Sequence, residues 1–164
     1  MTAAVGLDDE LALGRLGAGV QLVAADLDPG GVLGPELESA AAQAGCRFAL
    51  IRGDLTEDAF RDDCESRGPY DVALFVGLSS WLPKAPFVAH LKWLRTALKP
   101  GGVLVTDCFT PAAYAVGGSA MGYRASYYPP AVMCTLLDYC GFDGASAKVE
   151  SGRDAINHVI VATV

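Results

Sequence analysis

Short apolar runs and amphipathic segments alternate along most of the chain. The apolar runs are rich in branched aliphatic residues and predict β-strands over residues 19–26, 46–54, 70–77 and 101–109. Because these runs contain few polar positions, they are typical of strands covered on both faces. Helical patterns lie between them: one over residues 35–44 ends at Gly45, and one over 86–98 carries an apolar stripe and ends before Pro100. This alternation predicts a parallel sheet with right-handed crossovers.

The last part of the chain breaks this alternation. A helix is predicted over residues 130–139, and two strand-like runs follow at residues 145–151 and 156–164, separated only by Gly-Arg-Asp-Ala. A separation that short permits a hairpin and forbids a helical crossover. We therefore expect an α/β fold with a doubly wound, mostly parallel sheet and an antiparallel C-terminal hairpin, formed as a single domain over residues 1–164.

Two aspartates lie where predicted strands end. Asp26 closes the strand over 19–26, and Asp54 closes the strand over 46–54. Open α/β sheets bind ligands at the carboxyl ends of their strands, where an ionised carboxylate can accept two hydrogen bonds from the hydroxyls of a ribose. The alternative is local, because either aspartate could cap the turn or helix that follows it. Asp28 precedes Pro29 and Gly30 and is interpreted as a turn residue.

Composition and charge narrow the choice of partners. Hydrophobic residues make up 52% of the 164-residue chain, which is enough for a buried core. The formal net charge of −7 argues against nucleic acid or an anionic membrane as a partner, because both attract basic surfaces. No apolar segment is long enough to span a bilayer, and we expect no secretory signal, since no basic region leads into an apolar stretch. These features favour a cytoplasmic protein.

The cysteines and histidines give little sign of catalysis or metal binding. The chain has 5 cysteines and no C-x-x-C pair, and we interpret them as buried or incidental thiols of a reducing compartment. No ligand spacing suggests a metal site, so none is expected. His90 and His158 lie within a predicted helix and a predicted strand, where a structural role is expected. No Ser-His-Asp order fits a nucleophile elbow.

The order of these segments resembles the class I S-adenosylmethionine-dependent methyltransferases over roughly residues 19–164. The stretch "VAADLDP" resembles the second strand of that family, "ALIRGDLTE" the third, and "YDVALFVGLSSWLP" the fourth with the loop after it. The stretch "LRTALKPGGVLVTD" resembles a helix, a Leu-Lys-Pro-Gly-Gly turn and the fifth strand, and "LLDYCGF" resembles the last helix. The resemblance rests on the series as a whole.

The resemblance implies a methyltransferase that acts on a small molecule and uses S-adenosyl-L-methionine as its cofactor. It implies that Asp26 binds the ribose and that Asp54 contacts the adenine amino group. The implied cofactor-binding residues are Gly6, Asp26, Leu27, Asp54, Leu55, Gly77 and Leu78. The implied substrate-binding residues are Ser80, Trp81, Tyr114, Tyr123 and Arg124, of which those beyond residue 109 could instead form a surface loop packed by its own aromatic side chains. No catalytic residue is assigned, because the sulfonium already activates the methyl group.

The start of the chain departs from the family pattern. Class I methyltransferases have a glycine-rich loop after their first strand, whereas this chain offers only Gly6 there, followed by Leu7, Asp8 and Asp9. Three explanations stay open: upstream residues are missing, the loop has diverged while the cofactor still binds, or cofactor binding has been lost. We expect residues 2–6 to form the first strand, or a partner chain to cover the gap, because the neighbouring strands would otherwise expose unpaired backbone.

Two other functions compete with the methyltransferase. A non-catalytic binding or assembly module would keep the sheet and lose the cofactor loop. A nicotinamide-dependent reductase would also place a ribose on Asp26, although the C-terminal hairpin argues against it. The partner expected in the leading hypothesis is a small-molecule substrate, and the oligomeric state stays open, with a homodimer as one alternative.

Overall fold

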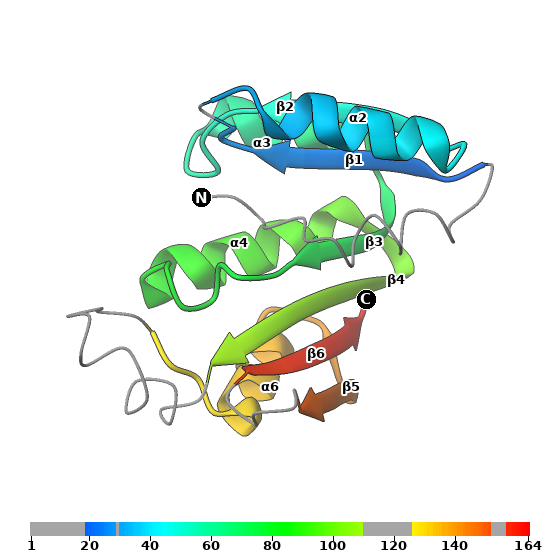
Figure 1. The fold of residues 1–164 in the computed structure, drawn as a ribbon. Coiled ribbons are helices and arrows are strands. Elements are labelled where there is room, and N and C mark those ends of the chain that lie inside the picture. Colours follow the sequence, from blue (N-terminus) through cyan, green and yellow to red (C-terminus); the bar gives the residue numbers. More distant parts are fainter. Residues whose placement is uncertain (1–18, 29, 110–125, 152–156) are drawn as a thin grey trace. The chain divides into compact units, whose positions relative to one another are not determined.

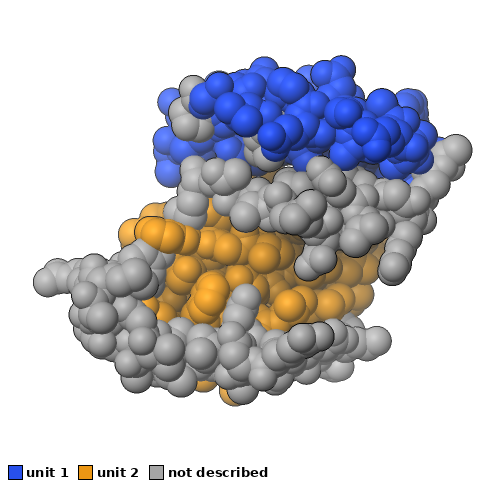
Figure 2. Space-filling model, viewed as in Figure 1, with its two compact units in different colours: residues 1–68 blue, residues 69–164 orange. Residues whose placement is uncertain are grey.

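The fold was analysed in a computed structural model, which describes residues 19–28, 30–109, 126–151 and 157–164. The described elements, drawn in Figure 1, are β1 (Gln21–Asp26), α2 (Leu33–Gln43), β2 (Arg47–Arg52), α3 (Asp58–Ser66), β3 (Tyr70–Phe75), α4 (Lys84–Ala97), β4 (Leu98–Phe109), α6 (Pro130–Tyr139), β5 (Asp143–Ser151) and β6 (Asn157–Thr163). The chain divides into two compact units, residues 1–68 and residues 69–164 (Figure 2). Each unit has its own described sheet, and the single domain stays a prediction.

The first unit is built on a parallel pair of strands. β1 and β2 align from Gln21 opposite Arg47 to Asp26 opposite Arg52, as expected for strands that are joined through a helix. That helix, α2, runs along the strand pair (Figure 1), and both α2 and α3 contact β2. The buried apolar side chains of this unit are Leu37, Ala41, Ile51, Phe60 and Cys64. Helix faces and strands therefore share a small apolar core.

The second unit contains a four-stranded sheet in the order β3–β4–β6–β5. β3 and β4 are parallel, whereas β6 runs antiparallel to both β4 and β5. The pairing of β5 with β6 confirms the predicted antiparallel strands at the end of the chain. The structure therefore supports a mixed α/β fold, with parallel pairs in both units and an antiparallel end.

α4 covers one face of the second sheet. Phe87 of α4 is fully buried and stacks on Phe75 of β3, with ring centroids 6.0 Å apart. Arg95 of α4 donates a hydrogen bond from Nε to the carbonyl oxygen of Gly141, 2.8 Å away, so that α4 and the end of α6 lie side by side. The fully buried side chains of the unit include Phe87, Leu91, Leu104, Met133, Leu137 and Ile160. They form its apolar core.

The other face of β3 differs from the sequence prediction. Its apolar run suggested a strand covered on both faces, but Val72 and Leu74 are 54% and 72% exposed. Side chains alternate between the two faces of a strand, and α4 packs against the face that carries Phe75. Within the described residues of the second unit, β3 therefore has one face packed against α4 and one face with exposed apolar side chains.

The fourth strand begins earlier than predicted. β4 starts at Leu98, directly after α4, rather than at Gly101. Gly101 has φ +76° and donates its N–H to the carbonyl oxygen of Val164 at 2.8 Å, while the Val164 N–H reaches the carbonyl oxygen of Gly102 at 3.0 Å. These bonds join the Lys-Pro-Gly-Gly segment to Val164. The segment therefore belongs to β4, whereas Pro and Gly in the sequence indicate a turn.

Candidate functional site

Asp26 lies at the carboxyl end of β1 and is only 6% exposed. Its Oδ1 accepts a hydrogen bond from the backbone N–H of Asp28 at 2.7 Å. The carboxylate therefore shapes the turn that follows the strand, as the local alternative predicted. Leu27, between the two aspartates, is 43% exposed. The turn thus combines a buried carboxylate with an accessible apolar side chain.

Asp28 is a structural residue of this turn. It has φ +34°, a left-handed conformation that aspartate tolerates better than most residues. Its buried Oδ2 lies 3.1 Å from Nε of Arg52 and accepts a long bond, 3.4 Å, from the N–H of Gly34 near the start of α2. A Cβ at Gly34 would lie 2.5 Å from the Arg52 guanidinium, so the glycine makes room for this ion pair.

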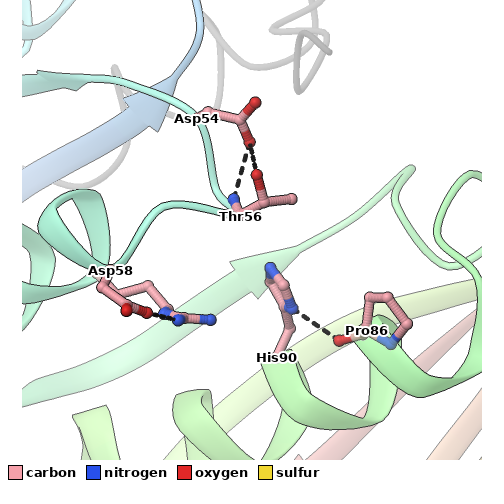
Figure 3. A network of polar contacts seen from close by, with 6 residues as sticks. Asp54, Thr56, Asp58, Pro86 and His90 are labelled. Carbon is pink, nitrogen blue, oxygen red and sulfur yellow. Dashed lines mark hydrogen bonds and ion pairs between the residues drawn. The ribbon is translucent and has the colours of Figure 1, made fainter.

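Asp54 is brought next to Asp26 by the parallel ladder. The N–H of Gly53 donates to the carbonyl oxygen of Asp26 at 3.1 Å, which extends the pairing one residue beyond β2. The Asp54 Oδ1 accepts bonds from both the N–H and the hydroxyl of Thr56, at 2.8 and 2.7 Å (Figure 3). Glu57, rather than Asp54 or Thr56, occupies the N-cap of α3. The helix-cap alternative is therefore wrong, and Asp54 instead stabilises the turn before the helix.

A second group of predicted residues follows β3 in the other unit. Gly77 has φ +79°, and its N–H donates to Oδ1 of Asp107 at 2.9 Å. Leu78 begins a turn in which its carbonyl oxygen accepts the N–H of Trp81 and of Leu82, each at 3.1 Å. Ser80 is buried, whereas Trp81 is 52% exposed.

Four predicted site residues lie outside the described residues: Gly6, Tyr114, Tyr123 and Arg124. The first strand expected at residues 2–6 also lies outside them. The structure therefore tests neither the proposed glycine contact to the cofactor nor the proposed aromatic substrate segment.

Sequence reasoning missed two side chains of β4 that hold the end of β3. Asp107 is 1% exposed and bonds Gly77, and the buried Thr106 donates its hydroxyl to the carbonyl oxygen of Phe75 at 2.8 Å. A signal for Asp107 was present, because it is an acid near the carboxyl end of a strand, like Asp26 and Asp54. In the same segment, the resemblance to the methyltransferase family depends on the Lys-Pro-Gly-Gly turn and assigns no role to Asp107.

The histidines and cysteines behave as structural groups. His90 is 2% exposed, donates from Nδ1 to the carbonyl oxygen of Pro86 at 2.7 Å (Figure 3) and stacks on Phe75. All five cysteines are free thiols. Burial raises the pKa of Cys64 and of Cys108 to about 11, with smaller contributions from the charges of Asp63 and Asp107 respectively. These buried thiols are neutral at physiological pH and poor nucleophiles.

Within the described residues, no group of three or more His, Cys, Asp or Glu side chains could hold a metal ion. None of the described helices is both long enough and apolar enough to cross a bilayer.

The fold is like that of the class I S-adenosylmethionine-dependent methyltransferases, and several solved structures of similar fold are methyltransferases. An O-methyltransferase family protein from Burkholderia thailandensis is 15% identical with a TM-score of 0.66, and the match covers 86% of this chain and 42% of that one. Human N-acetylserotonin methyltransferase, solved in complex with SAM, is 15% identical with a TM-score of 0.58, and the match covers 86% of this chain and 47% of that one.

A protein from Bordetella parapertussis, described as a possible exported protein, is 24% identical with a TM-score of 0.69, over 88% of this chain and 53% of that one. The chain spans about half the length of these three structures. At such identities the likeness shows the fold alone. No protein-family model and no curated protein matches the sequence.

Proposed function

We propose that the chain is an S-adenosylmethionine-dependent methyltransferase that acts on a small molecule. The fold supports this class of protein, but folds host many functions, so the proposal depends on the site. The observation that carries it is the pair of acids Asp26 and Asp54 at the carboxyl ends of adjacent parallel strands, next to the Gly53–Asp26 backbone bond. Ligands of open α/β sheets bind at this end of the strands.

The residues after β1 and β2 fit an adenosyl group. Its ribose offers two hydroxyl donors, its adenine an amino donor and an apolar ring face. Carboxylates are acceptors, and each has about four lone-pair sites, so the bond from Asp28 N–H to Asp26 is compatible with bonds from ribose hydroxyls. The exposed side chain of Leu27 offers an apolar surface for the ring. In this proposal Asp26 binds the ribose, and Asp54 with Leu55 contacts the adenine.

When bound, S-adenosylmethionine would supply a methyl group that its sulfonium already activates. The protein then has to hold the donor, align the acceptor and exclude water. The backbone of Gly77 and Leu78 is proposed to contact the cofactor, and Ser80 and Trp81 are proposed to contact the substrate. No side chain is assigned as a base, since a positioned acceptor can react without one.

Finer features belong to the same proposal. The parallel pairs β1–β2 and β3–β4 support a doubly wound, mostly parallel sheet. Five free thiols support a reducing compartment such as the cytoplasm. A small-molecule substrate, rather than nucleic acid or membrane, agrees with the net charge of −7. A homodimer stays one alternative for the oligomeric state.

The proposal is tested by calorimetric titration of S-adenosylhomocysteine into the wild-type chain and two variants. The wild type is expected to bind saturably, and Asp26→Asn to bind at least about tenfold more weakly, because a charge-assisted hydrogen bond is lost. Asp62→Asn is the matched control, since Asp62 is an exposed acid of α3, and its affinity should equal that of the wild type.

Two outcomes would contradict the methyltransferase. Absence of heat up to millimolar ligand would favour the non-catalytic module. A saturable fluorescence change with NADH, in a chain that ignores S-adenosylhomocysteine, would favour the nicotinamide-dependent reductase. Equal affinities of Asp26→Asn and the wild type would remove Asp26 from the site.

A further inference from the structure

β4 holds the end of β3 through two consecutive side chains. Thr106 donates its hydroxyl to the carbonyl oxygen of Phe75 at 2.8 Å, and Asp107 accepts the N–H of Gly77 at 2.9 Å. Both side chains are buried, with exposed fractions of 0% and 1%. The last carbonyl of the strand and an early N–H of the loop are therefore fixed from the neighbouring strand.

Gly77 has a backbone conformation that favours glycine, and its part-buried N–H is bonded to Asp107. Its φ of +79° lies in the left-handed region that glycine adopts without strain. A Cβ there would meet no atom within 4 Å, so the conformation, rather than a lack of space, requires glycine. A part-buried N–H without an acceptor would be unfavourable, and the Asp107 carboxylate supplies that acceptor where the chain changes direction.

The other end of the same loop is fixed by the segment before α6. The N–H of Ser126 donates to the carbonyl oxygen of Ser80 at 2.9 Å, and its hydroxyl donates to the carbonyl oxygen of Leu82 at 3.3 Å. The N–H of Tyr128 in turn donates to the carbonyl oxygen of Phe109 at the end of β4. The segment from Gly77 to Leu82 is here called the β3 loop. Asp107 of β4 bonds its first residue, and Ser126 bonds its last part.

The β3 loop contains a feature that internal packing does not explain. The Ser79 hydroxyl is fully buried, and none of the described residues forms a hydrogen bond with it. A buried hydroxyl without a hydrogen-bond partner is unfavourable, so the contacts from Asp107 and Ser126 hold the β3 loop in a conformation in which the Ser79 hydroxyl is not satisfied. An unsatisfied buried polar group in a native structure calls for an explanation, of which a bound ligand is one.

We infer that Asp107 is a positioning residue: through its bond to Gly77 it sets the conformation of the β3 loop and thereby the affinity of the chain for its ligand. Because Asp107 is almost completely buried, it acts through the loop and not by touching the ligand. The second half of this inference rests on the proposed function, because Gly77 and Leu78 are the residues proposed to contact the cofactor. The first half stands on the geometry of the second unit alone.

The test uses Trp81 as a reporter of the β3 loop. The chain has 2 tryptophans, so Trp93→Phe leaves Trp81 as the only one. The buried Nε1 of Trp93 forms no hydrogen bond with any described residue, so its replacement by phenylalanine should be mild. In this background we compare Asp107→Ala, Asp107→Asn and the control Asp138→Ala, which removes an exposed acid of α6. The readouts are Trp81 anisotropy, acrylamide quenching and the dissociation constant of S-adenosylhomocysteine.

Asp107→Ala is expected to lower the Trp81 anisotropy, to increase its quenching and to weaken S-adenosylhomocysteine binding about tenfold or more. Asp107→Asn should restore most of both signals, because its amide oxygen can still accept the Gly77 N–H. Asp138→Ala should match the parent in every readout. A merely structural role would lower the unfolding temperature without changing Trp81 far below that temperature.

Three results would overturn the inference. The first is that Asp107→Ala leaves the Trp81 anisotropy, its quenching and the affinity for S-adenosylhomocysteine unchanged. The second is that Asp107→Asn changes these readouts as much as Asp107→Ala does, which would make the charge of Asp107 rather than its bond to Gly77 decisive. If Asp107→Ala does not fold, Gly77→Ala replaces it as the test. A strained backbone at residue 77 should lower the Trp81 anisotropy and increase its quenching in the same way. Unchanged anisotropy and quenching of Trp81 in Gly77→Ala would contradict the inference. A parent chain that binds no S-adenosylhomocysteine would overturn the proposed function and the affinity half, while the Trp81 readouts still decide the loop half.

Discussion

Neighbouring residues of the turn after β1 have different tasks. Asp28 is committed to structure, because its buried carboxylate pairs with Arg52 and reaches the N–H of Gly34. Asp26 accepts one backbone bond from the same turn and lies at the strand end where α/β sheets bind ligands. Both carboxylates thus stabilise the turn, and the proposed ribose contact of Asp26 would add to its bond with the Asp28 N–H.

Gly53 provides a prediction about packing at the same strand end. A Cβ on Gly53 would lie 2.6 Å from the buried ring of Phe60, so Gly53→Ala should lower the free energy of unfolding by about 1–3 kcal/mol, as overpacking does. Gly30→Ala is the control, since its Cβ would make an ordinary contact at 3.5 Å with Val32. Urea unfolding measures both, and equal stabilities of the two variants would contradict the proposed packing.

Buried thiols predict how stability depends on pH. The pKa of Cys108 is raised from 9.0 to about 11 by burial, so the folded state holds its proton more tightly than the unfolded state. The stabilisation is therefore complete below about pH 9 and is lost as the pH rises through about 11. Two pH units correspond to at most about 3 kcal/mol. Cys108→Ala should accordingly flatten the fall in the free energy of unfolding over this range.

The control for this prediction is Leu104→Ala, which removes another fully buried side chain of β4 without a titratable group. Its free energy of unfolding should be lower than that of the wild type by a similar amount at both ends of the pH range. Urea unfolding at several pH values gives the slopes. A slope for Cys108→Ala as steep as that of the wild type would show that this thiol does not titrate as expected.

Elements with strong local end signals were predicted closely from the sequence. α6 spans Pro130–Tyr139 in the structure, as predicted, because a proline opens the helix and Gly141 follows it. The start of β4 was not predicted, since Leu98 pairs with Tyr70 of β3 and Gly101 bonds Val164, which are both distant in the sequence.

The candidate site was predictable to the same limited extent. Asp26 and Asp54 could be singled out because strand ends are visible in the hydrophobic pattern, and the structure places them at neighbouring strand ends. Their bonds to Asp28 and Thr56 also follow local turn rules. The bond between Asp107 and Gly77 could not be derived, because it joins β4 to the loop after β3, which is distant in the sequence.

α4 gives a prediction at the level of elements. Phe87 is fully buried and stacks on both Phe75 and Tyr128, with centroids 6.0 and 5.7 Å away. Phe87→Ala should therefore lower the free energy of unfolding by about 3–5 kcal/mol, which is typical for a buried aromatic side chain. Val132→Ala on α6 is the control, because Val132 is 45% exposed, and it should change stability by less than about 0.5 kcal/mol.

Denaturant unfolding followed by circular dichroism distinguishes these two variants. A small effect of Phe87→Ala would mean that α4 is not anchored to the second sheet through its aromatic stack. A large effect of Val132→Ala would place a covering element over α6 that the described residues do not include.

The chain combines a methyltransferase-like fold with about half the length of the three solved structures described above. The central claim is specific: the Asp26 carboxylate binds the ribose of an adenosyl cofactor.

A crystal structure of the chain with S-adenosylhomocysteine tests this claim most directly. If Asp26 binds the ribose, the ribose hydroxyl oxygens should lie about 2.5–3.0 Å from its carboxylate, with the adenine beside Leu27 and Asp54. A bound ligand whose ribose lies elsewhere, with Asp26 bonded only within its own turn, would contradict it.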